Sequence, residues 1–216
     1  MRLFWALIRI TSMVGTTALS LEGLVAVDAD VVRLRRGDLN VLSDLIARYQ
    51  NRLYRYLLRM VRQPVEAEDL FQQTWLKVIE KVGSFDATRN FEAWLFTLAR
   101  NLAIDHLRRI RPESLDEPLA DDGNCATAAD RIPSGDYTPF DTALAAERRT
   151  RIDEAMAALP MMYREVLTLR FEDEMKIEEI AQVTAVPVST AKSRLRRSLE
   201  QLRYALEARY PGGTWQ

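Results

Sequence analysis

The chain has very few of the side chains on which most catalytic and metal sites depend. Its 216 residues include one cysteine, Cys125, and one histidine, His106. A lone cysteine excludes an internal disulfide and a zinc site built on cysteines, and a lone histidine argues against a histidine-rich metal site or a Ser-His-Asp triad. The eight glycines form no Gly-rich phosphate loop. This inventory predicts a protein that is not an enzyme and that needs no metal or cofactor.

Long hydrophobic runs are also missing, including at the N-terminus. The first apolar run ends at Arg9, and the next uncharged run, residues 10–21, is rich in Thr, Ser and Gly. Such runs are too short and polar to span a membrane. A charge inside the apolar part is atypical of a signal peptide, although a weak export or anchoring signal stays an alternative. We expect residues 1–29 to be an N-terminal extension with little structure, in which Met13 could begin the functional chain as well as the first methionine.

The net charge of -1 conceals a strong segregation of charge along the chain. Five arginines and no acid lie between Arg48 and Arg62. Between Glu113 and Asp141 there are eight acids and only one arginine. Between Val186 and Gln216 there are six cations and two acids. Local fields steer partners, so a near-zero sum does not argue against binding to nucleic acid.

Helical periodicity dominates the first half of the chain. Apolar residues recur every three or four positions from Leu42 to Met60, and the opposite face of this predicted helix carries the arginine series. Pro64 ends the helix, because proline disfavours helical geometry in the residue before it. Further amphipathic helices are predicted over residues 65–82 and 91–109. The pattern predicts an all-α fold that starts with a helical bundle over residues 30–111.

Periodicity disappears over residues 112–142. This stretch holds four prolines, two glycines and the eight acids, a composition typical of flexible segments. Helical pattern then resumes over residues 143–210. The chain is therefore predicted to consist of two small helical domains joined by a flexible acidic linker.

Residues 177–195 have the spacing of a helix-turn-helix. The small side chain of Ala181 lets the two helices approach closely, and the φ of Pro187 suits the start of the second helix. In the major groove such a helix reads base edges with its early residues and holds phosphates with its cations. Short helix pairs with basic faces are common, but here the cations cluster on the second helix only. Its outward residues are Ser189, Thr190, Lys192, Ser193, Arg194, Arg196 and Arg197.

Several motifs occur in a characteristic order: "DLFQQTWLKVIEKVGSF", "FEAWLFTLARNLAIDHLRR", the acidic linker, "ALPMMYREVLTLRF" and "EEIAQVTAVPVSTAKSRLRRSLEQLR". Together they closely resemble a bacterial RNA polymerase sigma factor of the extracytoplasmic-function class of the sigma-70 family. The resemblance covers residues 38–203. It implies a transcription initiation factor that binds polymerase core and recognises the minus-ten and minus-thirty-five elements of promoters. Residues 30–111 would be sigma domain 2, and residues 143–210 would be sigma domain 4.

The resemblance also implies residue roles in the N-terminal domain. Binding to the clamp helices of the largest polymerase subunit falls to Asp69, Gln72, Gln73 and Trp75. Trp75 has the alternative of being a core side chain. Contact with the minus-ten element, including capture of an unstacked base, falls to Arg89, Asn90, Asn101, Arg108 and Arg109. The nearby aromatics Phe91 and Trp94 lie on the apolar stripe and are assigned to the core.

In the C-terminal domain, the resemblance implies that the helix-turn-helix reads the minus-thirty-five element through the seven outward residues named above. This domain would also contact the polymerase flap. The chain departs from the family at Ala185, where a glycine is usual in the turn. A left-handed conformation at a non-glycine residue costs on the order of 1 kcal/mol, so we expect some strain there.

The family also suggests how the factor is controlled. The linker would run through a cationic polymerase channel, although a plain solvated tether explains the same composition. An anti-sigma factor would hold the protein in the cytoplasm or at the membrane, with no membrane insertion of the chain itself. Two alternatives stay open: a two-domain repressor or activator with the same helix-turn-helix, and a helical adaptor that needs no basic helix.

Overall fold

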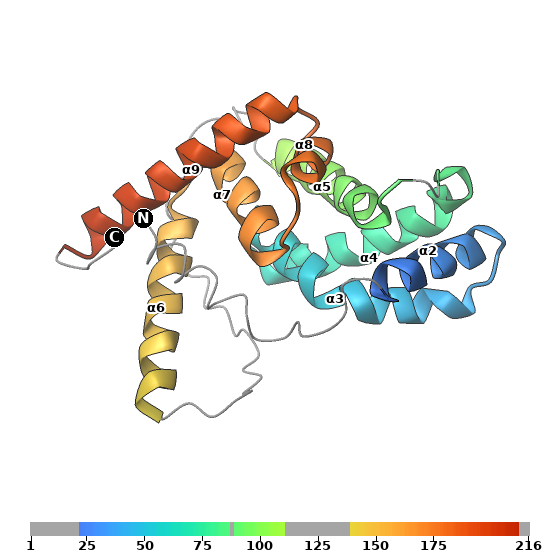
Figure 1. Cartoon of the computed structure of the whole chain (residues 1–216), viewed down its shortest axis with the longest axis horizontal. Helices are drawn as coiled ribbons and strands as arrows, with labels where there is room; N and C mark the ends of the chain where they lie inside the picture. Colours follow the sequence, from blue (N-terminus) through green and yellow to red (C-terminus); the bar gives the residue numbers. More distant parts are fainter. Residues whose placement is uncertain (1–21, 87–88, 111–138, 212–216) are drawn as a thin grey trace.

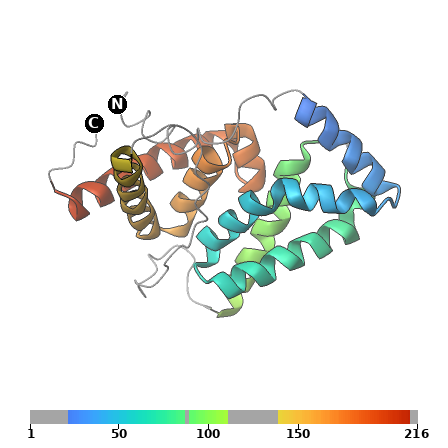
Figure 2. The same ribbon diagram turned by 90° about the horizontal axis from the view of Figure 1, so that it is seen from below.

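The structure is a computed structural model that describes the backbone of residues 22–86, 89–110 and 139–211, and side chains from residue 29 and, in the second half, from residue 147. These residues form helices and no strand, which confirms the predicted all-α fold. The N-terminal group contains α2 (Glu22–Arg35), α3 (Asn40–Val61), α4 (Pro64–Lys81), η1 (Val82–Ser84) and α5 (Phe91–Ile110). The C-terminal group contains α6 (Pro139–Ala157), α7 (Met161–Leu167), a π-helical turn η2 (Thr168–Glu172), α8 (Ile177–Val183) and α9 (Val188–Arg209). Figures 1 and 2 show the two groups side by side.

The N-terminal bundle is organised around α3. Its Leu45, Leu53 and Leu57 are completely buried against α4 and α5, and burying one leucine side chain contributes about 1.5–3 kcal/mol. Helix α3 ends before Pro64, because proline disfavours helical geometry in the residue that precedes it. Arg62 is left-handed with φ 64°, and Pro64 is the first residue of α4, where its missing N–H would have had no helical partner.

The N-terminal end of the bundle differs from the expectation. Helix α2 begins at Glu22, inside the stretch predicted to be an extension with little structure. Val31 and Leu34 are buried against α3, and this packing explains why the helix forms in spite of a weak sequence pattern. Residues 1–21 and most of the acidic linker lie outside the described residues. Within the described part, no helix has the length and apolar character needed to cross a bilayer.

Aromatic side chains close the bundle between η1 and α5. Phe85 and Phe91 are buried and meet edge to face, with ring centroids 5.7 Å apart. The ring of Trp94 lies 4.7 Å from that of Phe85 and is partly buried. Aromatic pairs in these arrangements contribute about 0.5–1.5 kcal/mol beyond their buried area. The assignment of Phe91 and Trp94 to the core agrees with their packing.

The C-terminal helices have only a small core of their own. Six buried residues form it: Ala155, Met156, Leu159, Leu167, Leu202 and Leu206. Most other buried apolar residues of the C-terminal helices belong to the core of the N-terminal bundle. Among them are Val166, Leu169, Met175 and Ile180. Helix α3 packs against α7 and η2, and α5 packs against α8. The sequence predicted two tethered units and did not predict that they pack together.

The turn between α8 and α9 has the strain expected at Ala185. Its φ is 53°, and two hydrogen bonds close a Schellman motif around it. The Val186 N–H donates to the carbonyl of Ala181 at 3.0 Å, and the Ala185 N–H donates to that of Gln182 at 3.2 Å. Ala185 thus occupies the position where helices most often place glycine.

Replacing Ala185 by glycine should stabilise the protein. Glycine removes a left-handed strain of about 1–2 kcal/mol, but the more flexible unfolded chain offsets about 0.4–1 kcal/mol of this gain. We expect the free energy of unfolding, measured by urea denaturation, to rise by up to about 1.6 kcal/mol. A loss of stability would show that the Ala185 methyl group makes packing contacts that outweigh the backbone strain.

Candidate nucleic-acid interface

Helix α9 carries the predicted minus-thirty-five residues in its first three turns. At 3.6 residues per turn, Ser189, Lys192, Ser193 and Arg196 share one face. Lys192 and Arg196 are exposed, and Arg196 lies 3.7 Å from Glu200 on the same helix. This face can therefore present two cations and two hydroxyls to a groove.

The other predicted α9 residues lie beside this face, on one flank of the helix, because Thr190, Arg194 and Arg197 follow each other at steps of four and three. Arg197 is exposed, whereas Thr190 and Arg194 are half-buried. The carbonyl of Thr190 accepts a hydrogen bond from the Ser193 hydroxyl at 2.9 Å. The positive charge of Arg194 acts inward on the buried carboxylate of Glu165. Arg194 is thus only partly available for contact with DNA.

Helix α5 carries the predicted minus-ten residues along one side. Asn90 precedes its first residue, Asn101 lies three turns further on, and Arg108 and Arg109 are in the last turn. All four side chains are exposed. Arg89 is exposed as well, 3.9 Å from Asp86 in the loop before the helix. The arrangement offers amides near the start of α5 and cations near its end.

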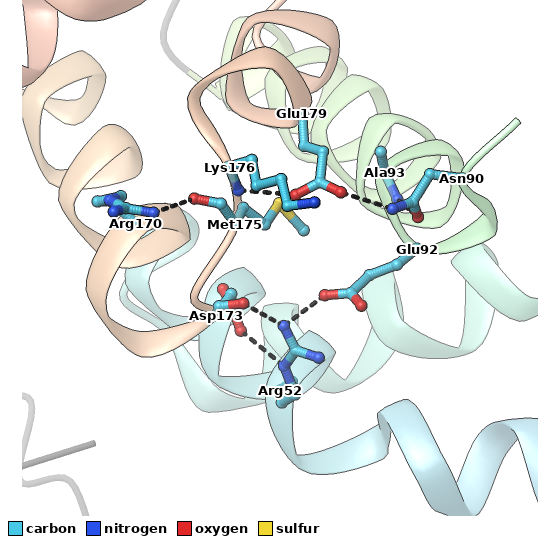
Figure 3. Close-up of polar contacts among 9 residues, drawn as sticks. All are labelled: Arg52, Asn90, Glu92, Ala93, Arg170, Asp173, Met175, Lys176 and Glu179. Atoms are coloured by element: carbon cyan, nitrogen blue, oxygen red, sulfur yellow. Dashed lines mark hydrogen bonds and ion pairs between the residues drawn. The ribbon is translucent and has the colours of Figure 1, made fainter. Parts of the chain in front are cut away.

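Asn90 has two structural partners in addition to its predicted role. Its Oδ1 accepts a hydrogen bond from the Ala93 N–H at 3.1 Å and so caps the N-terminus of α5. Its Nδ2 donates to Oε1 of Glu179 on α8 at 2.7 Å, as Figure 3 shows. The other oxygen of Glu179 accepts the backbone N–H of Lys176 at 2.7 Å. The C-terminal domain therefore occupies a polar group that was predicted to meet DNA.

Helix α4 presents the predicted polymerase-binding residues unevenly. Asp69, Gln72 and Gln73 are exposed. Trp75, in contrast, is only 5% exposed, and its indole nitrogen has no hydrogen-bond partner among the described residues. The structure thus places Trp75 in the core, which was its alternative assignment.

Helix α4 also exposes three large apolar side chains. Leu76 is 65% exposed, Val65 73% and Ile79 42%. With Asp69 and Gln72 they follow each other at steps of three and four, so they form one stripe along the helix, which we call the α4 stripe. The sequence analysis did not single out Leu76, although a leucine on a polar helix face was visible in the pattern.

Two arginines of the α3 series, Arg52 and Arg59, contact the C-terminal domain. Arg52 pairs with Glu92 of α5, donates from Nε to Oδ1 of Asp173 at 3.3 Å, and also donates to the Asp173 carbonyl (Figure 3). Burial alone would lower the pKa of Arg52. The negative charges of Glu92 and Asp173 outweigh the effect of burial, so the pKa of Arg52 is raised. Burial raises the pKa of Asp173 to about 8, against the opposing effect of Arg52, and also raises the pKa of Glu92. One guanidinium is thus shared by two carboxyl groups, one of which favours a proton.

Two further polar clusters join the domains. Arg59 pairs with Asp153 of α6 and, at 3.0 Å, with Glu172 of η2. Glu165 of α7 is fully buried, and its Oε1 accepts hydrogen bonds from the Tyr56 hydroxyl at 2.9 Å and from Nε of Arg100 at 2.7 Å. Burial raises the pKa of Glu165, and Arg100 and Tyr56 oppose this effect. Buried charges of this kind require their partners, because an unpaired one is strongly destabilising.

Known protein families match both halves of the chain. The family model for Sigma-70 region 2 matches residues 45–112, and the model for Sigma-70, region 4 matches residues 149–202. The ECF RNA polymerase sigma factor SigW of Bacillus subtilis is 31% identical over 177 residues, which cover 82% of this chain and 94% of SigW. The RNA polymerase sigma-H factor of Pseudomonas aeruginosa is 31% identical over 186 residues, which cover 82% of this chain and 92% of that protein.

Solved structures share the fold. The sigma factor RpoE of Bartonella quintana, in complex with the anti-sigma factor NepR, superposes with a TM-score of 0.59 at 23% identity and covers 77% of this chain and 96% of RpoE. CnrH, in complex with the cytosolic domain of CnrY, superposes with a TM-score of 0.59 at 20% identity and covers 84% of this chain and 97% of CnrH. Together with the two family models and the relatives at 31% identity, the arrangement described above leads to one conclusion: the chain belongs to the extracytoplasmic-function class of the sigma-70 family, whose members are transcription initiation factors and not enzymes.

Proposed function

We propose that the chain binds RNA polymerase core through the α4 stripe and directs it to promoters with two separate DNA surfaces. The observation that carries this proposal is the α4 stripe itself. Apolar Leu76 and Ile79 lie exposed beside Gln72 on a helix that leads into the predicted minus-ten helix. Exposed apolar groups within a polar rim are typical of protein–protein contacts. A repressor would not need such a surface beside its DNA contacts.

The two DNA surfaces have different tasks in this proposal. The α9 face with Lys192 and Arg196 would enter the major groove of the minus-thirty-five element. The polar side of α5, with Asn101 and Arg108, would hold the separated strand of the minus-ten element, where unstacked bases require polar edges and cations. Each surface makes few phosphate contacts, so tethering to polymerase supplies the effective concentration that either surface lacks alone.

Control by an anti-sigma factor follows from the same family membership. RpoE of Bartonella quintana was solved in complex with the anti-sigma factor NepR, and its fold is the fold of this chain. We propose a partner of this class here, acting in the cytoplasm because the polymerase works there. The acidic linker would occupy a cationic channel of the polymerase, to which its excess of acids is suited.

Run-off transcription tests the proposed function directly. Purified core polymerase should start at new sites in a promoter library only when the chain is added. The free chain should form no tight, sequence-specific complex with the same templates in a mobility-shift assay. A tight complex without polymerase, together with no binding to core in a pull-down, would identify a repressor or activator instead.

A further inference from the structure

Helix α2 has no task in the proposed function, and it precedes the part of the chain that the family model for Sigma-70 region 2 matches. It is held in place by Val31 and Leu34, which are buried in the core of the bundle. Its C-terminal end carries three arginines: Arg33, Arg35 and Arg36. The backbone that bears these arginines is therefore fixed on the surface of the bundle.

The turn after α2 is also well defined. Gly37 is left-handed with φ 89°, a conformation that glycine adopts at no steric cost. The Gly37 N–H donates to the carbonyl of Leu34 at 3.0 Å. The Asp38 N–H donates to that of Arg33 at 3.2 Å, which completes a Schellman motif. Nη2 of Arg33 also donates to Oδ2 of Asp38 at 2.8 Å, so the first acid after the arginine run is already paired inside the turn.

Arg35 and Arg36, in contrast, keep their charges available. Both side chains are exposed, and neither guanidinium group has a hydrogen bond or an ion pair among the described residues. By comparison, Arg48 of the neighbouring helix α3 lies 3.4 Å from Asp30 of α2. The helix dipole favours cations at this end of α2, but it leaves both guanidinium groups open to solvent and to an anion.

These two arginines lie at the end of the bundle where α5 begins. Helices α3 and α4 are neighbours joined by a short turn, so the start of α3 and the end of α4 lie at one end of the bundle, as Figure 1 shows. Helix α2 ends just before α3 and packs against η1, which leads into the loop with Arg89 and Asn90. Arg108 and Arg109 are at the opposite end of α5. A strand that follows α5 from its end to its start therefore comes next to α2.

We propose that Arg35 and Arg36 bind backbone phosphates of the separated DNA strand where it continues past the loop with Arg89 and Asn90. Guanidinium groups suit this ligand, because they bind phosphate oxygens through paired, charge-assisted hydrogen bonds. Phosphate contacts hold a strand in place and carry no sequence information, so this surface adds affinity at any promoter. The inference rests on the proposed function, in which α5 holds the strand first.

Two DNA templates of different length test this surface in the complex with core polymerase. Both carry a promoter found by run-off transcription, and the non-template strand ends either directly after the minus-ten element or several nucleotides later. The double variant Arg35→Gln/Arg36→Gln should bind the longer template about tenfold more weakly than the wild type at about 0.1 M salt, because two single-strand phosphate contacts and their counterion release are lost. Its binding to the shorter template should not change.

Two further variants control for charge and for chemistry. Arg148→Gln/Arg149→Gln makes the same change in charge, since these neighbouring arginines are exposed on α6. It should bind both templates as the wild type does. Arg35→Lys/Arg36→Lys should keep most of the affinity for the longer template, because lysine also binds phosphate, as a point charge.

Two results with the templates would overturn the inference. Equal weakening on both templates would indicate that the two arginines contact polymerase and not the strand. Unchanged binding to both templates would leave the helix dipole as the reason for cations at this end of α2.

A second measurement does not depend on initiation. The affinity of the free chain for a labelled random-sequence single-stranded oligonucleotide is measured over a series of salt concentrations. The slope of log affinity against log salt should become shallower by about 1.4 in the glutamine double variant, about 0.7 for each lost phosphate contact. If the wild type fails in run-off transcription but the slope changes in this way, the initiation role is wrong and the phosphate surface is real. If the slope is then unchanged as well, the phosphate surface is also wrong.

Discussion

Replacing Lys192 and Arg196 together by glutamate should reduce promoter-specific run-off transcription by about a hundredfold or more. Both side chains are exposed on the same face of α9, and each specific groove contact is worth about 1–3 kcal/mol. Reversing the charge adds repulsion from the phosphates to the loss of the contacts. The affinity for polymerase core, measured in a pull-down, should not change, because the α4 stripe lies on the other domain.

A matched control separates this effect from the loss of two positive charges. Arg148 and Arg149 are exposed on α6 in the same domain, and their replacement by glutamate changes the net charge equally. This control should transcribe at nearly the wild-type level. Equal losses in both variants would show that the overall charge of the domain matters and that α9 has no special role. Full activity of the α9 variant would place minus-thirty-five recognition elsewhere.

Local sequence patterns predicted the helices well because each pattern has a local physical cause. The stripe from Leu42 to Met60 is the buried side of α3, and Pro64 starts the next helix as its chemistry requires. The substitution of Ala185 at a glycine position correctly indicated left-handed strain. Such features depend only on residues a few positions away, so a single sequence contains the information needed to predict them.

The packing of the two domains could not be predicted in this way. Arg52 and Asp173 are 121 positions apart, and nothing near either residue specifies the other. The sequence showed the arginine series as the polar face of a helix, but not that acids of the same chain pair with it. Periodicity reports which face of a helix is apolar and not which other element covers it.

The burial of Trp75, in contrast, could have been predicted from the sequence pattern. It lies four residues after Phe71 and three before Val78, so helical periodicity alone places it on the buried side of α4. The rings of Phe71 and Trp75 are in fact 6.4 Å apart. The resemblance to the family favoured an interface role for this aromatic residue. The exposed apolar residue nearest to Gln72 and Gln73 is instead Leu76.

We therefore expect Leu76→Asp to weaken binding to polymerase core by about thirtyfold or more, because truncating a central hot spot costs at least about 2 kcal/mol and a carboxylate in an apolar contact adds a desolvation penalty. The measurement is a titration of labelled chain with core polymerase. Leu39→Asp is the matched control, since Leu39 is 61% exposed just before α3 and lies outside the α4 stripe. Leu76→Asp should fold normally, because the side chain is largely in solvent. If both variants bind core as the wild type does, the polymerase contact does not include the α4 stripe, and the buried Trp75 could reach core only after α4 rearranges.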